Sequence, residues 1–490
     1  MSTPYTQPSK YKISQTYNPN FPSDLNQGYT FHQDESQNIS NGLYYETLIG
    51  HLIVNKLSTK IVGKGLTPMA SPELSILGWS DEQIKKFCSQ AEALYRLIAN
   101  EKSFDWYNQD PIDQLQKKAI KMIFNTGDIL LHIGFRKKNG EVVPFVQLIS
   151  GKLVKNPGLI EDTKECVGGV YRNAKGQAIA YSVMVVGDYL EDTYEFKKVY
   201  KYNQTTGREE YDLITLDSPE SGLVRGIPRL TTSKDDILQI SKLKEVHLTK
   251  AVIQSLFSVV IEKDVQKTEE TTPFKDRVLA SAMPKDQATE VDEAREPIVL
   301  QPGNVIELEN GEKMKAVETA LQSSDFIETL KMELSLVASN AGISYEELVG
   351  MFSSSYSASR ATINESEKTY ADLRNEFINK FLNPIWRLII DYGVLTGQIE
   401  APGYYDSDLM RKAIYGVTWT GVNPTQVDPT KDVKAYTEAI NNGLCTHEYA
   451  TRMLYGLDFE EVAERLKDEK EKFSQGINNG ETQNGTNNGE

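Results

Sequence analysis

Hydrophobic residues recur every three or four positions near the start of the folded part of the chain. From about residue 44 onward, Leu48, Ile53 and Leu57 fall on one face, which predicts a surface helix. This spacing ends at residues 62–65, where two glycines break it. The same spacing predicts two further helices, over residues 80–97, with Ser80 and Gln83 as a capping box, and over residues 112–124.

After Gly127 the pattern changes to short β-branched and aromatic runs. Turn residues such as Asn139-Gly140 separate these runs, which is typical of strands joined by tight turns. An antiparallel β region is therefore expected after the helices. Its predicted strands cover residues 129–135, 142–149, 170–171, 179–186 and 196–200.

Two long stretches of helical spacing then flank a charged segment. Residues 233–258 predict one helix and residues 323–341 the other. Between them, residues 262–296 are dense in charge, which indicates an irregular or only partly ordered chain. Short strands are expected at residues 298–300 and 305–308.

The last third of the chain predicts one very long helix and several shorter ones. Ser344 and Glu347 are spaced to cap a short helix. A serine-rich stretch follows at residues 353–357, and a long helix then covers about residues 358–396. Composition alone favours a solvated linker for the serine-rich stretch. Three C-terminal helices are expected over residues 431–440, 448–454 and 460–472.

Length and charge narrow the class of protein. At roughly 150 residues per domain, a chain of 490 residues suggests about three units. Lys and Arg number 53 against 69 Asp and Glu, so the formal net charge is 53 − 69 = −16. An acidic surface repels phosphate, so contact with DNA must be local or weak. The 39% hydrophobic and 25% charged fractions are near globular averages, which argues against wholesale disorder.

The cysteines and the length of the apolar runs indicate the redox compartment of the chain and whether it crosses a membrane. Cys88, Cys166 and Cys445 lie far apart without a CxxC pair, which argues against a disulfide framework and fits a reducing compartment. Apolar runs are much shorter than the roughly 20 residues of a membrane span. The N-terminus lacks the apolar region of a secretory signal. The sequence therefore predicts a chain that does not cross a bilayer.

The chain carries none of the motifs that indicate an enzyme. A GxxxxGK[ST] phosphate loop is absent, and the five histidines are isolated, without an HExxH pair. Carboxylates such as Asp105, Asp110, Asp113 and Asp128 show no spacing that singles out an acid and base pair. We therefore expect no catalytic residues, no metal and no cofactor.

A short motif carries a resemblance to a known family. Residues 355–361 read Ser-Tyr-Ser-Ala-Ser-Arg-Ala and precede Glu365 and a helix containing Asn383-Pro384-Ile385-Trp386. This resembles the lambda-like family of phage portal proteins, in which such a segment leads from the tunnel loop into a long helix. Fragments at residues 62–68, 148–149, 169–171, 176–181, 225–228, 300–303, 342–348, 419–421, 427–432 and 443–446 occur in the family's order. The resemblance covers about residues 45–470 and departs at residues 262–296 and in both tails.

The resemblance implies an α+β fold, the phage portal fold, assembled as a ring. This fold is mainly helical with an antiparallel β region and is divided into wing, stem, clip and crown. The implied regions are a disordered N-terminal arm (1–43), a wing that is helical and then β-rich (44–228), a first stem helix (229–258), a clip (259–320), a second stem helix (321–342), a tunnel-loop region (343–360), a long wing helix (361–402), crown helices (403–474) and a disordered tail (475–490).

The resemblance also places the residues of the DNA channel. Serine hydroxyls hydrogen-bond phosphate weakly without adding charge, so DNA can slide past them. Met351 and Phe352 are expected either to pack the start of the loop against a neighbouring subunit or, equally, to make a core contact within the chain. The residues expected to line the tunnel loop are Met351, Phe352, Ser353, Ser354, Ser355, Tyr356 and Ser357.

Two further groups of residues have expected roles. Arg360 begins the helix after the loop and is expected to pair with a carboxylate such as Glu365, because a ring of unpaired arginines would hold phosphate too firmly. The clip is expected to dock partners through its charged side chains. These are Glu269, Glu270, Lys275, Arg277 and Lys285.

The implied function is a channel at one vertex of a capsid, made by a ring commonly of twelve subunits. DNA would enter through it during packaging by the terminase motor and leave through it at ejection. The implied partners are further copies of the chain, double-stranded DNA, the terminase large subunit, the major capsid protein and scaffold, and neck or head-completion proteins, with no membrane. The protein would reside in the virion and assemble in the host cytoplasm.

Two alternatives stay open at this point. The chain could be another virion structural or connector protein that forms a ring without the stem, tunnel loop and crown. It could also be a hydrolase that works as a monomer through scattered carboxylates. Particle size separates a ring from a monomeric enzyme.

Overall fold

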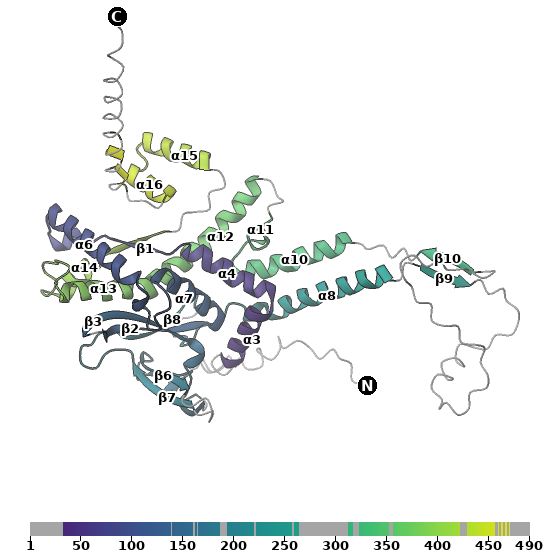
Figure 1. Ribbon diagram of the computed structural model, residues 1–490, viewed down its shortest axis with the longest axis horizontal. Helices are drawn as coiled ribbons and strands as arrows, with labels where there is room; N and C mark the ends of the chain where they lie inside the picture. Colours follow the sequence, from purple (N-terminus) through teal and green to yellow (C-terminus); the bar gives the residue numbers. More distant parts are fainter. Residues whose placement is uncertain are drawn as a thin grey trace, which may run out of the picture. The chain divides into compact units, whose positions relative to one another are not determined.

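The computed structural model describes residues 33–138, 140–159, 162–163, 165–186, 194–219, 222–256, 259–263, 312–316, 323–351, 356–421 and 429–455, with isolated positions between 459 and 470. The chain mixes helices with small antiparallel sheets, which confirms the expected combination of helix and sheet (Figure 1). It divides into two compact units. The larger comprises Met1–Leu238 and Met332–Glu490, and the smaller comprises Gln239–Lys331.

The N-terminal helices of the larger unit follow the hydrophobic pattern. Ser80 and Gln83 form the expected capping box at the start of α6 (Asp81–Ala99). The helix α4 (Leu48–Val62) ends at Gly63, whose φ of 63° lies in the left-handed region that glycine adopts without strain. Further helices are α5 (Leu74–Leu77), the 3₁₀ turn η1 (Lys102–Phe104) and α7 (Ile112–Thr126). The helices predicted in this part are confirmed.

The expected disordered arm, residues 1–43, extends too far. Residues 33–43 belong to the helix α3 (Gln33–Glu46), and residues 1–32 lie outside the described part of the chain. The buried face of α3 carries Gln33, Gln37 and Ser40 as well as Leu43. Polar side chains fill this face because they bond to backbone and amide groups of the body, so a hydrophobic pattern could not reveal the helix.

Two antiparallel sheets follow the helices. The first has the order β3-β2-β8, from β2 (Asp128–Lys138), β3 (Glu141–Ser150) and β8 (Tyr211–Thr215). The second has the order β4-β5-β6-β7, from β4 (Cys166–Val167), β5 (Val170–Arg172), β6 (Ala178–Val186) and β7 (Tyr194–Tyr200). Leu130, Val154, Tyr181, Val183 and Val199 form one buried cluster between the sheets. The five predicted strands are confirmed, and β4 and β8 add to them.

The first part of the segment expected to form the crown, residues 403–474, contacts the N-terminal part of the larger unit. The strand β11 (Val417–Thr420) pairs with β1 (Thr67–Ala70) in antiparallel register, Pro68 opposite Trp419. Trp419 Nε1 also donates to Asn383 Oδ1 at 2.8 Å, which ties β11 to the body. The helix α14 (Asp408–Ile414) precedes β11. The strand β11 is therefore held in the larger unit by its backbone pairing with β1 and by the hydrogen bond of Trp419 to Asn383.

Two of the three predicted C-terminal helices are confirmed. They are α15 (Pro429–Asn441) and α16 (His447–Tyr455). The third, predicted over residues 460–472, lies largely outside the described residues.

The long helix predicted over residues 358–396 is present but is not uniform. It consists of α12 (Tyr356–Phe377), the π-helical segment η6 (Ile378–Leu382) and α13 (Asn383–Leu395). The π-helical segment ends two residues before Pro384, which stands in the first turn of α13. Proline has no N–H to donate and its ring crowds the preceding α-helical turn, which accounts for the local change of hydrogen bonding at this point.

Two long helices run through the remaining part of the chain. They are α8 (Lys234–Leu256) and α10 (Ser323–Ala341), which confirms the helices predicted over residues 233–258 and 323–341. In the smaller unit, His247 of α8 stacks on Phe326 of α10 with ring centroids 3.9 Å apart. A hairpin of β9 (Val259–Lys263) and β10 (Glu312–Ala316) also belongs to this unit. The strands predicted at residues 298–300 and 305–308 lie outside the described residues.

Candidate functional site

The predicted tunnel loop is bounded by two well-defined helices. The short helix α11 (Tyr345–Val349) ends at Gly350, which adopts a left-handed conformation with φ of 75°, and Met351 follows with 64% of its surface exposed. The helix α12 begins at Tyr356. Tyr356 and Ser357, which were expected in the loop, therefore lie in the first turn of α12. Phe352, Ser353, Ser354 and Ser355 lie outside the described residues.

The expected junction at Arg360 lies further into the helix than predicted. Arg360 stands in the second turn of α12, since the helix begins at Tyr356. Glu365 accepts a hydrogen bond from Lys368 Nζ at 2.8 Å, an exposed pair on the same helix. The side chain of Arg360 lies outside the described part of the chain, so its partner stays a prediction.

Glu347 of α11 is a buried carboxylate with three side-chain partners. Lys60 Nζ lies 2.7 Å from Glu347 Oε1, while Tyr370 and Ser344 hydroxyls donate to Glu347 Oε2 at 3.0 and 3.1 Å. Ser344 also caps α11 by accepting from the Glu347 N–H at 3.2 Å. We call these four residues the loop base. They join α4 to α11 and α12, the helices that precede and follow the predicted loop in the chain.

The charges of the loop base are matched. Burial acts to raise the pKa of Glu347, but Lys60 and the two hydroxyl donors outweigh it, so the pKa of Glu347 lies below its ordinary value. Burial and the adjacent Glu347 carboxylate raise the pKa of Tyr370 far above neutrality. The carboxylate is thus ionised and the phenol protonated at neutral pH, which is the state that this hydrogen bond requires.

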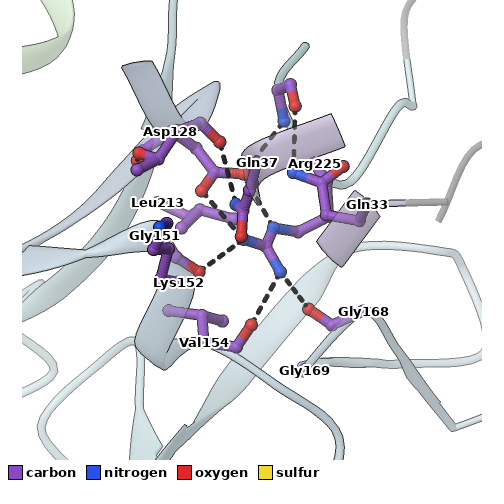
Figure 2. Close-up of polar contacts among 12 residues, drawn as sticks. Gln33, Gln37, Asp128, Gly151, Lys152, Val154, Gly168, Gly169, Leu213 and Arg225 are labelled. Atoms are coloured by element: carbon purple, nitrogen blue, oxygen red, sulfur yellow. Dashed lines mark hydrogen bonds and ion pairs between the residues drawn. The ribbon is translucent and has the colours of Figure 1, made fainter. Parts of the chain in front are cut away.

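A second buried cluster precedes the first long helix (Figure 2). Arg225 Nε and Nη2 donate to the two carboxylate oxygens of Asp128 at 2.7 and 2.9 Å. The same guanidinium donates to the carbonyl oxygens of Val154, Gly168 and Gly151, each at 2.7 Å. We call these five residues the arginine junction. Both charged side chains are fully buried, with 2% and 0% exposure.

The arginine junction draws several segments of the chain to one point. Gly226 N donates to Asp128 Oδ2 at 3.0 Å, and Gln33 Nε2 donates to Gly226 O at 3.1 Å (Figure 2). Gln37 Nε2 donates to Thr126 O at 2.8 Å. Space is tight at this point, because a Cβ on Gly151 would lie 1.9 Å from an Asp128 carboxylate oxygen. The helix α3, both sheets and the segment leading to α8 are therefore locked together.

The body-side ends of the two long helices are tied to each other. Asn340 Nδ2 donates to Thr232 Oγ1 at 2.7 Å and to Ser233 Oγ at 2.8 Å, which links the end of α10 to the segment just before α8. Arg229 donates to Ala341 O at 3.3 Å and pairs with Asp217. These contacts hold the end of α10 against the segment before α8 within the larger unit.

The sequence did not reveal either cluster in its role. In the sequence, Asp128 is one of many carboxylates without distinctive spacing, and the segment Arg225-Gly226-Ile227-Pro228 is distinguished only by its resemblance to the family. A fully buried arginine requires a carboxylate and carbonyl oxygens as partners, but the sequence does not show that Arg225 is buried. The pattern could not say which carboxylate, since 97 residues separate the pair.

The charged side chains of both clusters are paired within the fold. The described residues contain no group of three or more His, Cys, Asp or Glu side chains arranged to hold a metal ion. Within the described chain, no helix is both long and apolar enough to cross a membrane. Arg225, Asp128 and Glu347 have their charges neutralised by neighbours, which suits a structural role. The predicted clip residues, Glu269, Glu270, Lys275, Arg277 and Lys285, lie outside the described residues.

Comparison with known proteins gives consistent results. Residues 25–374 match the family described as "Phage portal protein, lambda family". The chain is 22% identical over 448 residues to the portal protein of Escherichia phage N15, covering 85% of this chain and 80% of that protein. It is also 22% identical over 451 residues to portal protein B of Escherichia phage lambda, with the same coverage.

Solved structures resemble the chain more distantly. A chain from "Virion of native gene transfer agent (GTA) particle" has 12% identity and a TM-score of 0.43, covering 86% of this chain and 93% of that one. A chain from "Neck of empty GTA particle computed with C6 symmetry" has 11% identity and a TM-score of 0.44, covering 85% and 93%. The assignment rests on the match to residues 25–374, which spans most of the chain. The chain therefore belongs to the lambda family of phage portal proteins.

Proposed function

We propose that this portal protein assembles as a ring, commonly of twelve subunits, at one capsid vertex. Double-stranded DNA would pass through the ring during packaging and again during ejection. The observation that carries the proposal is the family match over residues 25–374, which includes both long helices and the loop base. The role is structural, and no catalytic residue is proposed.

Exposed apolar side chains on the long helices support ring assembly. In α8, Val246 and Leu248 are 66% and 64% exposed, and in α10, Met332 and Leu336 are 65% and 54% exposed. Apolar groups gathered on a protein surface commonly mark contact with a partner. A second copy of the chain is the partner proposed, since head-to-tail contacts that close generate a ring.

Mass photometry tests the ring. Wild-type protein at micromolar concentration should give a species many times heavier than one chain, and Leu248→Asp should shift it toward single chains. Leu97→Asp is the matched control, because Leu97 of α6 is 70% exposed but lies on neither α8 nor α10. A wild-type protein that stays monomeric, or equal effects of the two variants, would contradict the proposal.

The loop after Gly350 is proposed to face the bore. The loop base ties α11, which precedes this segment, to α12, which follows it, and Met351 at the start of the segment is exposed. The serines at positions 353–355 would offer hydroxyl groups to passing phosphates. The net charge of −16 favours weak contact with DNA, which a translocating strand requires.

Residues 259–320 are proposed as the clip that meets the terminase large subunit and later the neck proteins. Their high charge density is unsuited to core burial but suits a surface whose partners exchange during assembly. Deleting residues 268–289 should leave rings intact yet abolish packaging. Deleting residues 476–490 of the tail is the control and should leave both intact. Normal packaging by the first deletion would show that docking occurs elsewhere.

The remaining partners follow from the position proposed for the ring. At a capsid vertex its periphery would contact the major capsid protein and, during assembly, the scaffold. The finished ring would reside in the virion after assembly in the host cytoplasm. Immunogold labelling of purified particles at a single vertex tests this location, and labelling at many vertices would contradict it.

A further inference from the structure

A cavity of about 370 Å³ opens between the two sheets. Its apolar wall includes Leu153, Met184 and Val185, and its aromatic wall includes Trp106, Tyr107 and Tyr211. The aromatic wall is held rigidly. Tyr211 stacks on His132 with ring centroids 4.0 Å apart, and His132 Nδ1 lies 2.9 Å from Gln147 Oε1.

Large apolar and aromatic side chains at the rim of this cavity are exposed to solvent. Trp106 and Tyr107 are 39% and 55% exposed, and Val185 on the opposite wall is 45% exposed. Tyr107 OH accepts a hydrogen bond from Gln147 Nε2 at 3.1 Å, so the ring is fixed in place. Rigid aromatic groups around a concave apolar surface are typical of a docking site for a protein segment.

We propose that this cavity binds residues 17–22 of the chain's own N-terminal arm, with Phe21 as the anchor. This segment reads Tyr-Asn-Pro-Asn-Phe-Pro. Its prolines at 19 and 22 favour an extended backbone before binding, which lowers the entropic cost of docking. Segments of this kind dock in aromatic-lined grooves, and a phenylalanine ring suits the apolar interior of the cavity.

The position of the arm's attachment supports the same chain as the source. Asp34, at the start of α3, pairs with Lys155 Nζ at 3.0 Å. Lys155 is only two positions beyond Leu153, which lines the cavity. The chain from Phe21 to Asp34 has 34 − 21 = 13 residue steps and spans up to roughly 43 Å when extended. The cavity is therefore within reach of the arm.

The arm also has a composition that needs a binding partner. Its first 32 residues carry six aromatic side chains, at positions 5, 11, 17, 21, 29 and 31. So few other apolar residues accompany them that they cannot form a core of their own. Docking on the body removes the anchor ring from water. This contact is independent of ring formation, because it lies within one subunit.

Photo-cross-linking of the full chain tests the proposal. Phe21 is replaced by p-benzoylphenylalanine, which reacts with nearby C–H bonds and favours methionine. Irradiation should give a product of the mass of one chain with position 21 joined to Met184, identified by peptide mass spectrometry. The same probe in place of Tyr5 should give little of this product.

Paired variants test the cavity itself. Val185→Arg places a charged side chain in the wall and should reduce the cross-link to Met184 about tenfold. Ile179→Arg is the matched control, because Ile179 lies on the same strand β6 and is 40% exposed but does not line the cavity. A probe at position 21 that cross-links elsewhere, or only between two chains, would overturn the proposal, as would equal yields from the two arginine variants.

Discussion

Arg225 and Asp128 are 97 positions apart in the chain, yet the guanidinium donates to both carboxylate oxygens, at 2.7 and 2.9 Å. Both side chains are excluded from solvent. The planar guanidinium of arginine can donate two parallel hydrogen bonds to one carboxylate, which a lysine ammonium group cannot do. The pair fixes the segment that leads into α8 against the start of β2.

Removing this arginine should destabilise the protein strongly. Arg225→Met leaves the Asp128 carboxylate buried without its partner, which typically costs about 3–5 kcal/mol. Urea denaturation should show this loss in the free energy of unfolding. Lys412→Met is the control, since the Lys412–Asp408 pair is exposed and its loss should cost at most about 1 kcal/mol. Similar losses in the two variants would show that the junction is not a structural anchor.

The space around the arginine junction allows a second test. In Gly151→Ala the new Cβ would lie 1.9 Å from Asp128 Oδ1, so the ion pair must shift, at a cost of about 1–3 kcal/mol. At Gly42 of α3 a Cβ meets nothing within 4 Å, so Gly42→Ala should stabilise the helix by about 0.5–1 kcal/mol. Thermal denaturation should therefore move in opposite directions. A shared direction would contradict the packing described.

The loop base should make stability depend on pH. Because the pKa of Glu347 is lower in the folded state than its ordinary 4.5, the carboxylate stabilises the fold above that value. This contribution is lost as the pH falls through the lowered pKa. The melting temperature of Glu347→Gln should thus lie below wild type at neutral pH, and the gap should narrow under acid conditions. Glu365→Gln, on an exposed pair, is the control. A gap unchanged by pH would refute this role for Glu347.

Charge in the proposed loop should alter DNA handling. Replacing Ser353, Ser354 and Ser355 together by lysine adds positive groups that release counterions from DNA, so retention of DNA should become strongly dependent on salt and packaging should slow. The same serines replaced by asparagine keep polarity without charge and should behave like wild type. The test is to measure the packaging rate and the length of retained genome for both variants over a series of salt concentrations. If the lysine variant keeps wild-type values throughout, these serines do not line the channel.

Local pattern predicted most of the helices and strands correctly. Ser80 and Gln83 form the capping box that their spacing indicated, and the hydrophobic spacing from Leu48 to Leu57 did yield a helix. These features depend on residues within one or two turns of each other. Sequence reasoning is reliable there because the interactions are themselves local.

Prediction failed where distant segments determine the structure. The helix α3 buries Gln37, whose side chain donates to Thr126 O. Its buried face is therefore largely polar, and no stripe of apolar residues predicts the helix. The strand β11 was not expected because Trp419 finds its partner in Pro68 of β1, far away in the chain. The first described turn of α12 begins at Tyr356, within a stretch whose serines favour a linker by composition.

Residue spacing along the chain predicted the alternation of helical and β segments and their order, and the resemblance of short motifs in the family's order indicated the family. Three contacts between distant segments could be known only from the folded chain. Arg225 pairs with Asp128, Glu347 contacts Lys60 and Tyr370, and the two sheets leave a cavity lined by aromatic side chains between them. A buried charge must find its counterpart wherever the fold brings one near. That choice depends on distances in space, which spacing along the chain does not contain.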